Sequence, residues 1–274
     1  LDYSHTPYGA STPTAGRRAQ AFGRRNSMNW TVMHCSYSAA VKTLALIILL
    51  AGTACLGDPP EDRNPEMVSA NATYLALGDS YTIGESVEPS LRWPVQLVKA
   101  LNEEGVDAEA PVIIARTGWT TDELQVGIAE AGMAETFDLV SLLIGVNNQY
   151  RGRDLEEYRA QFVDLLTTAV GFAGGKAENV LVLSIPDWGV MPFAEGRDRV
   201  QIGVEIDAFN RVNQEESLRV GTRYVDVTEI SREAAGQPDL VAEDGLHPSG
   251  DMYARWAEAS LPTALEILHT YRRR

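Results

Sequence analysis

Cysteine and histidine are both scarce in this chain of 274 residues. Its two cysteines, Cys35 and Cys55, stand within the first 55 residues. The region that follows can therefore form no disulfide framework and no thiolate metal site. Beyond residue 54 there are only two histidines, His247 and His269. A reaction that needs an imidazole base thus has two candidates in the main part of the chain.

Basic residues are the second shortage. The first 54 residues contain five basic residues and one acidic residue, which leaves 18 basic and 37 acidic residues after them. The formal net charge of that remainder is −19. Such a surface repels the phosphates of nucleic acids and anionic lipid headgroups. We therefore expect no nucleic-acid partner, and solubility is a sufficient explanation for the acidity.

A long apolar run is also missing. The apolar segment 44–51, which follows Lys42, is too short for a membrane span, which needs about 20 residues. It has the features of a secretory signal peptide, and the small residues before Cys55 resemble a bacterial lipoprotein signal in which that cysteine carries the lipid. An ordinary signal peptide cleaved nearby is the alternative.

These patterns divide the chain into three parts. Residues 1–54 are an upstream segment and signal peptide outside the fold, and residues 55–72 are the lipidated cysteine and a polar, proline-rich tether. Residues 73–274 form one domain of ordinary size. We expect an exported protein, periplasmic or at the cell surface, that meets a bacterial membrane only through the anchor at Cys55.

Short apolar runs alternate with longer segments of helical periodicity in the third part, which predicts βαβ units and a parallel sheet. The fold class is then α/β, a three-layer doubly wound sandwich around a five-stranded, mainly parallel sheet. Ligands bind beyond the carboxyl ends of the strands in such folds. The expected strands are 73–77, 112–115, 139–144, 180–185 and 224–227, and the expected helices are 93–102, 121–131, 155–173, 202–220 and 251–271.

Polar motifs follow the first three expected strands at that edge of the sheet. A fourth motif precedes the last helix and could reach the same edge. In chain order the motifs are Gly78-Asp79-Ser80, Thr117-Gly118, Gly145-Val146-Asn147-Asn148 and Asp244-Gly245-Leu246-His247.

The first three motifs are ambiguous when each is taken alone. A serine after a strand, such as Ser80, is more often a helix cap than a nucleophile. Gly118 lets a backbone N–H approach a ligand closely, but it could equally be a turn glycine. Asn147 can donate to a developing oxyanion or form an Asx turn. The choice between Asn147 and Asn148 rests on their spacing from Gly145.

The fourth motif supplies a base with its orienting carboxylate. Asp244 lies three residues before His247 and can bind the Nδ1 atom of its ring, which leaves Nε2 to accept a proton from a serine hydroxyl. Asp79 is adjacent to Ser80, which favours a structural role in the turn over a position behind the histidine. His269 is expected to be solvated or packed.

In combination, the four motifs in this order resemble those of the SGNH (GDSL-type) hydrolase superfamily over residues 73–270. The resemblance implies a flavodoxin-like fold and hydrolysis of carboxylic esters through an acyl-enzyme, with no metal or organic cofactor. It implies Ser80 as the nucleophile and Asp244 and His247 as its partners. It also implies an oxyanion hole formed by the N–H groups of Ser80 and Gly118 and by the side chain of Asn147.

Two residues depart from the family's motifs. Tyr81 stands where leucine is frequent, and Asn148 stands where aspartate is usual, which affects a hydrogen bond beside the site. The resemblance leaves several ester substrates open, namely short-chain acyl esters, lysophospholipids and acetylated glycans. A pocket for the acyl or aryl group is expected from loop residues Trp119, Trp188, Met191 and Phe193, which could instead be ordinary packing residues.

Two other functions remain as alternatives. A thioesterase would use the same machinery as an esterase. A lipid-tethered binding protein that had lost catalysis would be expected to lack one member of the triad, and none is missing here.

Overall fold

The computed structural model describes residues 71–272. A single sheet of five parallel strands forms the middle layer, in the order β2-β1-β3-β4-β5. This order is that of flavodoxin-like doubly wound folds. The predicted three-layer α/β sandwich is therefore confirmed. The strands are β1 (Tyr74–Gly78), β2 (Val112–Ala115), β3 (Leu139–Leu143), β4 (Val180–Leu183) and β5 (Arg223–Val225).

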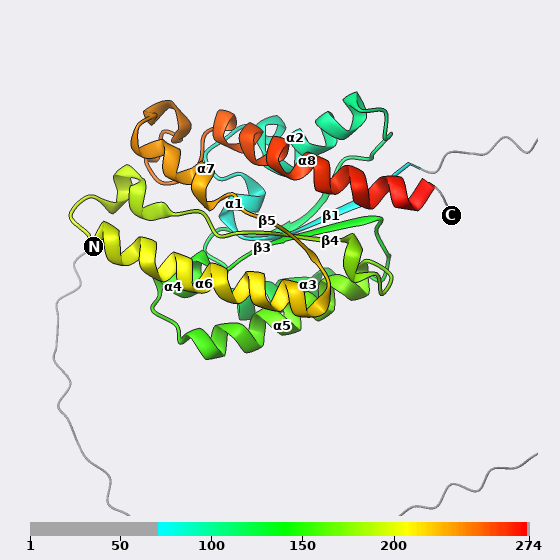
Figure 1. Cartoon of the computed structure of the whole chain (residues 1–274), viewed down its shortest axis with the longest axis horizontal. Helices are drawn as coiled ribbons and strands as arrows, with labels where there is room; N and C mark the ends of the chain where they lie inside the picture. The colour runs from blue at the N-terminus through cyan, green and yellow to red at the C-terminus, as the bar shows by residue number, and fades with distance from the viewer. Residues whose placement is uncertain (1–70, 273–274) are drawn as a thin grey trace, which may run out of the picture. The chain divides into compact units, whose positions relative to one another are not determined.

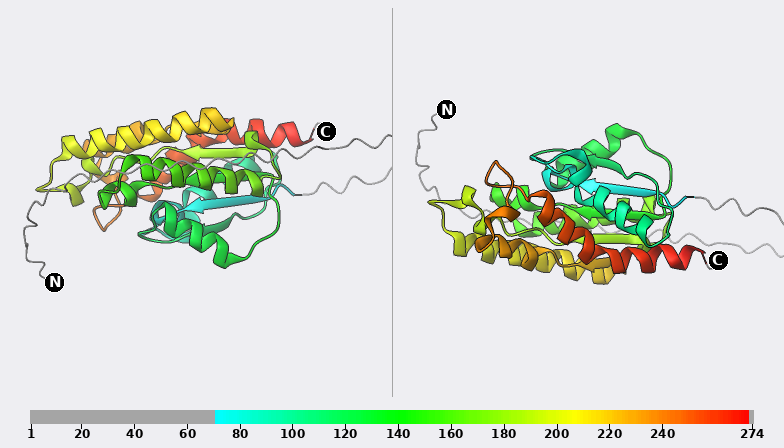
Figure 2. Two further views of the ribbon diagram at one scale, coloured as in Figure 1. Left: turned by 90° about the horizontal axis from the view of Figure 1, so that it is seen from below. Right: turned by 90° about the horizontal axis from the view of Figure 1, so that it is seen from above.

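Long helices cover both faces of the sheet (Figures 1 and 2). On one face, α2 (Trp93–Glu103) packs against α8 (Gly250–Arg272). On the other, α5 (Leu155–Phe172) lies between α3 (Thr121–Ala131) and α6 (Arg199–Val220). Among residues 71–272, no helix combines the length and the hydropathy that crossing a bilayer requires.

Burial explains why the sheet is so easily recognised in the sequence. Every residue of β1, β3 and β4 is buried, because helices cover both faces of these central strands. Cα pairing aligns Gly78 at the end of β1 with Ala115 of β2 and with Leu143 of β3. The segments that follow these three strands therefore start at the same edge.

Three short helices were not predicted: α1 (Ser80–Ile83), α4 (Val146–Tyr150) and α7 (Thr228–Arg232). Each has at most five residues, so its apolar positions cannot show a helical period. The helix α6 begins at Arg199, three residues earlier than expected, because the Asp198 side chain accepts a hydrogen bond from the Gln201 N–H (3.0 Å) and caps it.

The described part of the chain starts two residues before the predicted domain. Ala72, which the sequence assigns to the tether, is buried and pairs with Ala108 as an isolated parallel bridge. The predicted signal segment, Cys55 and residues 55–70 of the tether lie outside the described residues, as does the side chain of His269.

Candidate active site

The turn after β1 places Ser80 beyond the edge of the sheet. A β-carbon on Gly78 would lie 2.2 Å from Thr82 Oγ1 and 2.5 Å from the carbonyl oxygen of Leu143, so only glycine fits at this crossing. The chain then turns directly into α1, with Ser80 as its first residue. Ser80 is 5 % exposed, and it lines a cavity.

Asp79 holds this turn. Its carboxylate is fully buried and accepts a hydrogen bond from the backbone N–H of Tyr81 at 3.1 Å, which caps α1. Burial raises the pKa of Asp79 to about 7, although the backbone hydrogen bonds oppose that shift. The position beside Ser80 is thus a structural one, as expected from its adjacency to the serine.

His247 and Asp244 form a hydrogen-bonded pair. Nδ1 of His247 lies 2.6 Å from Oδ2 of Asp244, while Oδ1 of Asp244 accepts the backbone N–H groups of Leu246 and His247, both at 2.9 Å. The carboxylate thus fixes both the ring and the loop that carries it. With Nδ1 engaged, Nε2 is the ring nitrogen left to exchange a proton.

Ser86 forms a fourth hydrogen bond with this carboxylate, and the motifs did not indicate it. Its Oγ donates to Oδ2 of Asp244 at 2.6 Å, the same oxygen that binds His247. Burial alone would raise the pKa of Asp244, but the hydrogen bonds from Ser86, from His247 and from two backbone amides outweigh it and hold this pKa well below its usual range. The carboxylate therefore stays ionised.

Tyr81 occupies the position where the family motif often has leucine. It is buried, and its ring meets that of His247 at an interplanar angle of 63° with 5.6 Å between centroids. On its other side it packs against Trp256 of α8 (6.0 Å). The larger side chain thus supports the imidazole from within the core.

The structure gives the two neighbouring asparagines different roles. Asn147 lines the same cavity as Ser80, and its Nδ2 donates to the carbonyl oxygen of Trp119 at 2.9 Å. Asn148 is buried and bonds twice to Thr121, accepting its N–H (3.1 Å) and donating to its hydroxyl (2.7 Å). Asn148 therefore joins α4 to the first residue of α3, whereas Asn147 faces the cavity.

Gly118 also lines this cavity, with a backbone φ of +84°. That left-handed conformation strains any residue with a β-carbon, so glycine is required for this path of the loop. Arg151 holds the loop from outside, because its Nη2 donates to the carbonyl oxygen of Gly118 at 2.5 Å.

The candidate catalytic residues that the sequence indicated lie around one cavity of about 190 Å³. Ser80, Gly118, Asn147 and His247 all line it, and Asp244 binds the His247 ring. These residues come from the ends of β1, β2 and β3 and from the loop before α8. Their side chains combine a hydroxyl, an imidazole–carboxylate pair and an amide donor, the set that acyl transfer needs.

Aromatic side chains form one wall of the cavity, but two of the expected ones are absent from it. Trp188 and Phe193 line it as predicted. Trp119 does not, because its ring lies against Gly127 of α3, where an added β-carbon would be 2.1 Å away. Met191 does not either, because it is fully buried in the core.

Tyr150 takes their place. It lines the cavity from the end of α4, with its ring centroid 5.4 Å from that of Trp188 and 6.3 Å from that of Phe193. We call Tyr150, Trp188 and Phe193 the aromatic wall. The sequence did not indicate Tyr150 as a cavity residue, because the helix α4 that carries it was not predicted.

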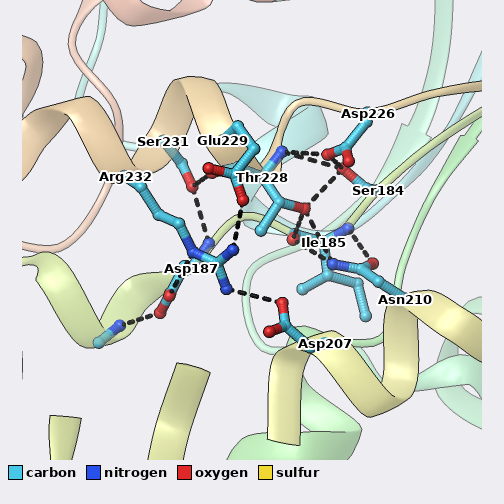
Figure 3. Close-up of polar contacts among 11 residues, drawn as sticks. Ser184, Ile185, Asp187, Asp207, Asn210, Asp226, Thr228, Glu229, Ser231 and Arg232 are labelled. Carbon is cyan, nitrogen blue, oxygen red and sulfur yellow. Dashed lines mark hydrogen bonds and ion pairs between the residues drawn. The ribbon is translucent and has the colours of Figure 1, made fainter. Parts of the chain in front are cut away.

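Asp187, which precedes Trp188, belongs to a polar network that includes Arg232 and Asp207 (Figure 3). Asp187 accepts the N–H of Gly189 at 2.9 Å and so caps the single 3₁₀ turn that contains Trp188. Its other carboxylate oxygen accepts from Nε of Arg232 at 3.0 Å, and Arg232 also bonds Asp207 of α6 at 2.6 Å. The loop after β4 is thereby tied to α6 and α7.

Replacing Arg232 by leucine should lower the free energy of unfolding by about 2–4 kcal/mol, because the carboxylate of Asp187, 6 % exposed, would be left buried without its cation. Urea denaturation followed by circular dichroism measures this loss. Lys99→Leu is the matched control, since Lys99 and Glu103 are mostly exposed and their pair contributes about 0.5 kcal/mol or less. Equal losses in the two variants would contradict a stabilising role for the network.

Within residues 71–272, no group of three or more His, Cys, Asp or Glu side chains could hold a metal ion.

Comparisons with known proteins identify the family and the fold. The model of the GDSL-like lipase/acylhydrolase family matches residues 76–255. A comparison of the sequence with curated proteins gives no significant match.

Solved structures with the same fold include a protein named TesA, which is 25 % identical with a TM-score of 0.56, over 72 % of this chain and 99 % of that one. Axe2, an acetylxylan esterase from Geobacillus stearothermophilus, is 21 % identical with a TM-score of 0.56, over 70 % and 94 %. The psychrotrophic esterase EstA from Pseudoalteromonas sp. is 16 % identical with a TM-score of 0.53, over 73 % and 100 %.

Proposed function

Since the chain belongs to the GDSL-like lipase/acylhydrolase family of SGNH hydrolases and is a carboxylic ester hydrolase, we propose that it works through an acyl-enzyme on Ser80. The observation that carries the proposal is the His247–Asp244 pair, whose imidazole lines the same cavity as the Ser80 hydroxyl. A strand-end serine alone would be ambiguous, but a serine that shares a cavity with an oriented imidazole is what a serine hydrolase requires.

The proton moves between Ser80 and His247. The imidazole Nε2 accepts the Ser80 proton as the oxygen attacks the ester carbonyl, and the ionised carboxylate of Asp244 stabilises the imidazolium that forms. The same imidazolium then protonates the leaving alcohol. Water repeats the sequence on the acyl-enzyme and releases the acid, so His247 ends each half-reaction in its starting state.

The negative charge that develops on the carbonyl oxygen requires fixed donors. We assign this role to the N–H groups of Ser80 and Gly118 and to Nδ2 of Asn147, because these three residues line the cavity. The contact of Asn147 with the Trp119 carbonyl oxygen holds its amide in one orientation before substrate binds. Donors that are oriented in advance need no reorganisation during the reaction.

The size of the cavity favours short acyl groups. A space of about 190 Å³ with an aromatic wall accommodates an acetyl or other short-chain group together with part of the alcohol. Acetylated glycans and lysophospholipids remain substrate candidates, because the cavity is open on one side to a larger alcohol group. A thioester would meet the same donors and the same nucleophile.

A panel of 4-nitrophenyl esters from two to twelve acyl carbons, with acyl thioesters of the same lengths, tests this function. We expect the highest kcat/KM at two to four carbons and faster cleavage of oxygen esters than of thioesters. Cleavage of long-chain esters or of thioesters at the higher rate would contradict the short-chain esterase assignment.

Changing Asn147 to alanine should lower kcat by about 10²–10³ because one oxyanion donor is lost. Asn148→Ala is the contrast variant: it breaks both bonds to Thr121 and should reduce thermal stability more than it reduces kcat. Steady-state kinetics with 4-nitrophenyl acetate and melting curves of both variants separate the two roles. A normal kcat in Asn147→Ala would remove this side chain from the mechanism.

A further inference from the structure

One arginine lies against the aromatic wall. The guanidinium carbon of Arg197 is 5.2 Å from the ring centroid of Tyr150, 5.4 Å from that of Trp188 and 5.1 Å from that of Phe193. Its Nη2 donates to the hydroxyl of Tyr150 at 3.2 Å. The residues that carry the three rings also line the cavity of Ser80. The guanidinium is not part of that lining but lies against it.

The position of Arg197 relative to the cavity is fixed by its own segment. The N–H of Arg197 donates to the carbonyl oxygen of Ala194 at 3.1 Å, and the N–H of Phe193 donates to the carbonyl oxygen of Gly245 at 2.9 Å. Gly245 belongs to the loop between Asp244 and His247. The segment that carries the arginine is therefore bonded directly to the loop that carries the imidazole.

Within the part of the chain that the structure describes, the guanidinium of Arg197 has one hydrogen-bond acceptor, the hydroxyl of Tyr150. The residue is exposed, and none of the ion pairs formed among residues 71–272 includes it. Acidic residues far outnumber basic ones, and other arginines such as Arg151, Arg159 and Arg232 are engaged with carboxylates. A guanidinium that forms no ion pair among the described residues and lies on the aromatic wall is thus a local positive site in a mainly acidic molecule.

We propose that Arg197 binds an anionic group of the ester substrate, a carboxylate or a phosphate, while the neighbouring part of that substrate lies against the aromatic wall. The inference rests on the proposed function and defines its substrate class further. A guanidinium presents paired N–H donors that match the oxygens of either anion. Its stacking on three rings reduces the conformational freedom that binding would otherwise cost.

The competing explanation is that Arg197 only supports the rings. In that case its loss would disturb the wall and slow charged and neutral esters alike. Binding of an anion would instead slow charged esters selectively. The ratio of kcat/KM for a charged ester to that for its neutral counterpart distinguishes the two roles, because any general damage to the wall cancels in the ratio.

Matched esters provide that ratio. For the alcohol side, 4-acetoxybenzoate and 4-acetoxyphenyl phosphate are compared with methyl 4-acetoxybenzoate, and for the acyl side the 4-nitrophenyl monoester of adipate is compared with its methyl ester. Arg197→Gln should lower the ratio roughly fivefold on at least one side, chiefly through KM, and Arg197→Lys should retain part of it. The wild-type ratio should fall as salt is added.

Arg211→Gln is the control, because it removes the same charge from an exposed position of α6, about 18 Å along the helix from its first residue. It should keep the wild-type ratio on both sides. Equal ratios in Arg197→Gln and wild type on both sides would overturn the proposal. Equal ratios would overturn the role of Arg197 alone if neutral esters are still cleaved by wild type and not by Ser80→Ala. Cleavage that survives in Ser80→Ala would instead refute the proposed function itself.

Discussion

Replacing Ser80 with alanine should lower kcat/KM for short-chain esters by about 10⁴–10⁶, the largest effect expected of any single change in this chain. The reason is that the reaction loses the atom that forms the covalent acyl intermediate, while the binding cavity and the oxyanion donors remain. Residual hydrolysis above the rate in water would come from those remaining donors. Spectrophotometric assay of 4-nitrophenyl acetate measures both rates.

The control for this variant is Ser90→Ala, which removes an exposed hydroxyl from the 3₁₀ turn Pro89–Leu91 and should leave the rate unchanged. Mass spectrometry gives a second measurement. Wild type that is quenched during turnover should carry an added acyl mass on the peptide that contains Ser80, and the alanine variant should not. An acyl group found on another residue would move the nucleophile elsewhere.

The sequence predicts the sheet and the long helices because the forces that form them act locally. An unbroken apolar run such as Val180–Leu183 has to be covered on both faces, and the glycines and polar residues that end each run mark the strand boundaries. Short connections alone do not set the order of the strands, because β1 lies between β2 and β3, which are consecutive in the chain. Short helices such as α4 are decided by tertiary contacts, including the bonds of Asn148 to Thr121, and therefore leave no periodic pattern.

The candidate site also has a part that the sequence predicts and a part that it does not. Ser80, Gly118 and Asn147 follow three neighbouring strands, so topology brings them to one edge. Asp244 and His247 are three residues apart, so their pairing is local. Side-chain contacts between segments that are far apart in the chain could not be predicted from the sequence. Ser86 and Asp244 are 158 positions apart, and nothing in the sequence near Ser86 marks it as a partner of a carboxylate.

The aromatic wall shows most clearly what the sequence alone cannot predict. Loop aromatics were rightly expected at the cavity, but which of them face it depends on packing. Trp119 turns toward Gly127 because the absence of a side chain there leaves room for an indole ring. Trp188 faces the cavity because Asp187 and Arg232 fix its turn.

Changing Asp244 to asparagine should lower kcat by about 10³–10⁴ with little loss of stability. The amide oxygen can still accept the backbone N–H groups of Leu246 and His247, so the loop should keep its shape. The amide nitrogen, however, would face Nδ1 of His247 and cannot accept its proton, which favours the tautomer that cannot take the proton of Ser80. Because the pKa of Asp244 is lowered, the wild-type carboxylate is ionised at every pH above about 4.

Ser86→Gly should cost much less, about tenfold in kcat, because it removes only one of the donors to Oδ2 of Asp244. Glycine is the right replacement, since Ser86 has a φ of +64° and a β-carbon at that position is already strained. Asp239→Asn, an exposed carboxylate in another loop, is the control and should keep the wild-type kcat. Pre-steady-state assays of acylation, with melting curves for each variant, test this order of effects. An Asp244→Asn variant as active as Ser86→Gly would mean that the carboxylate holds the loop without acting on the imidazole.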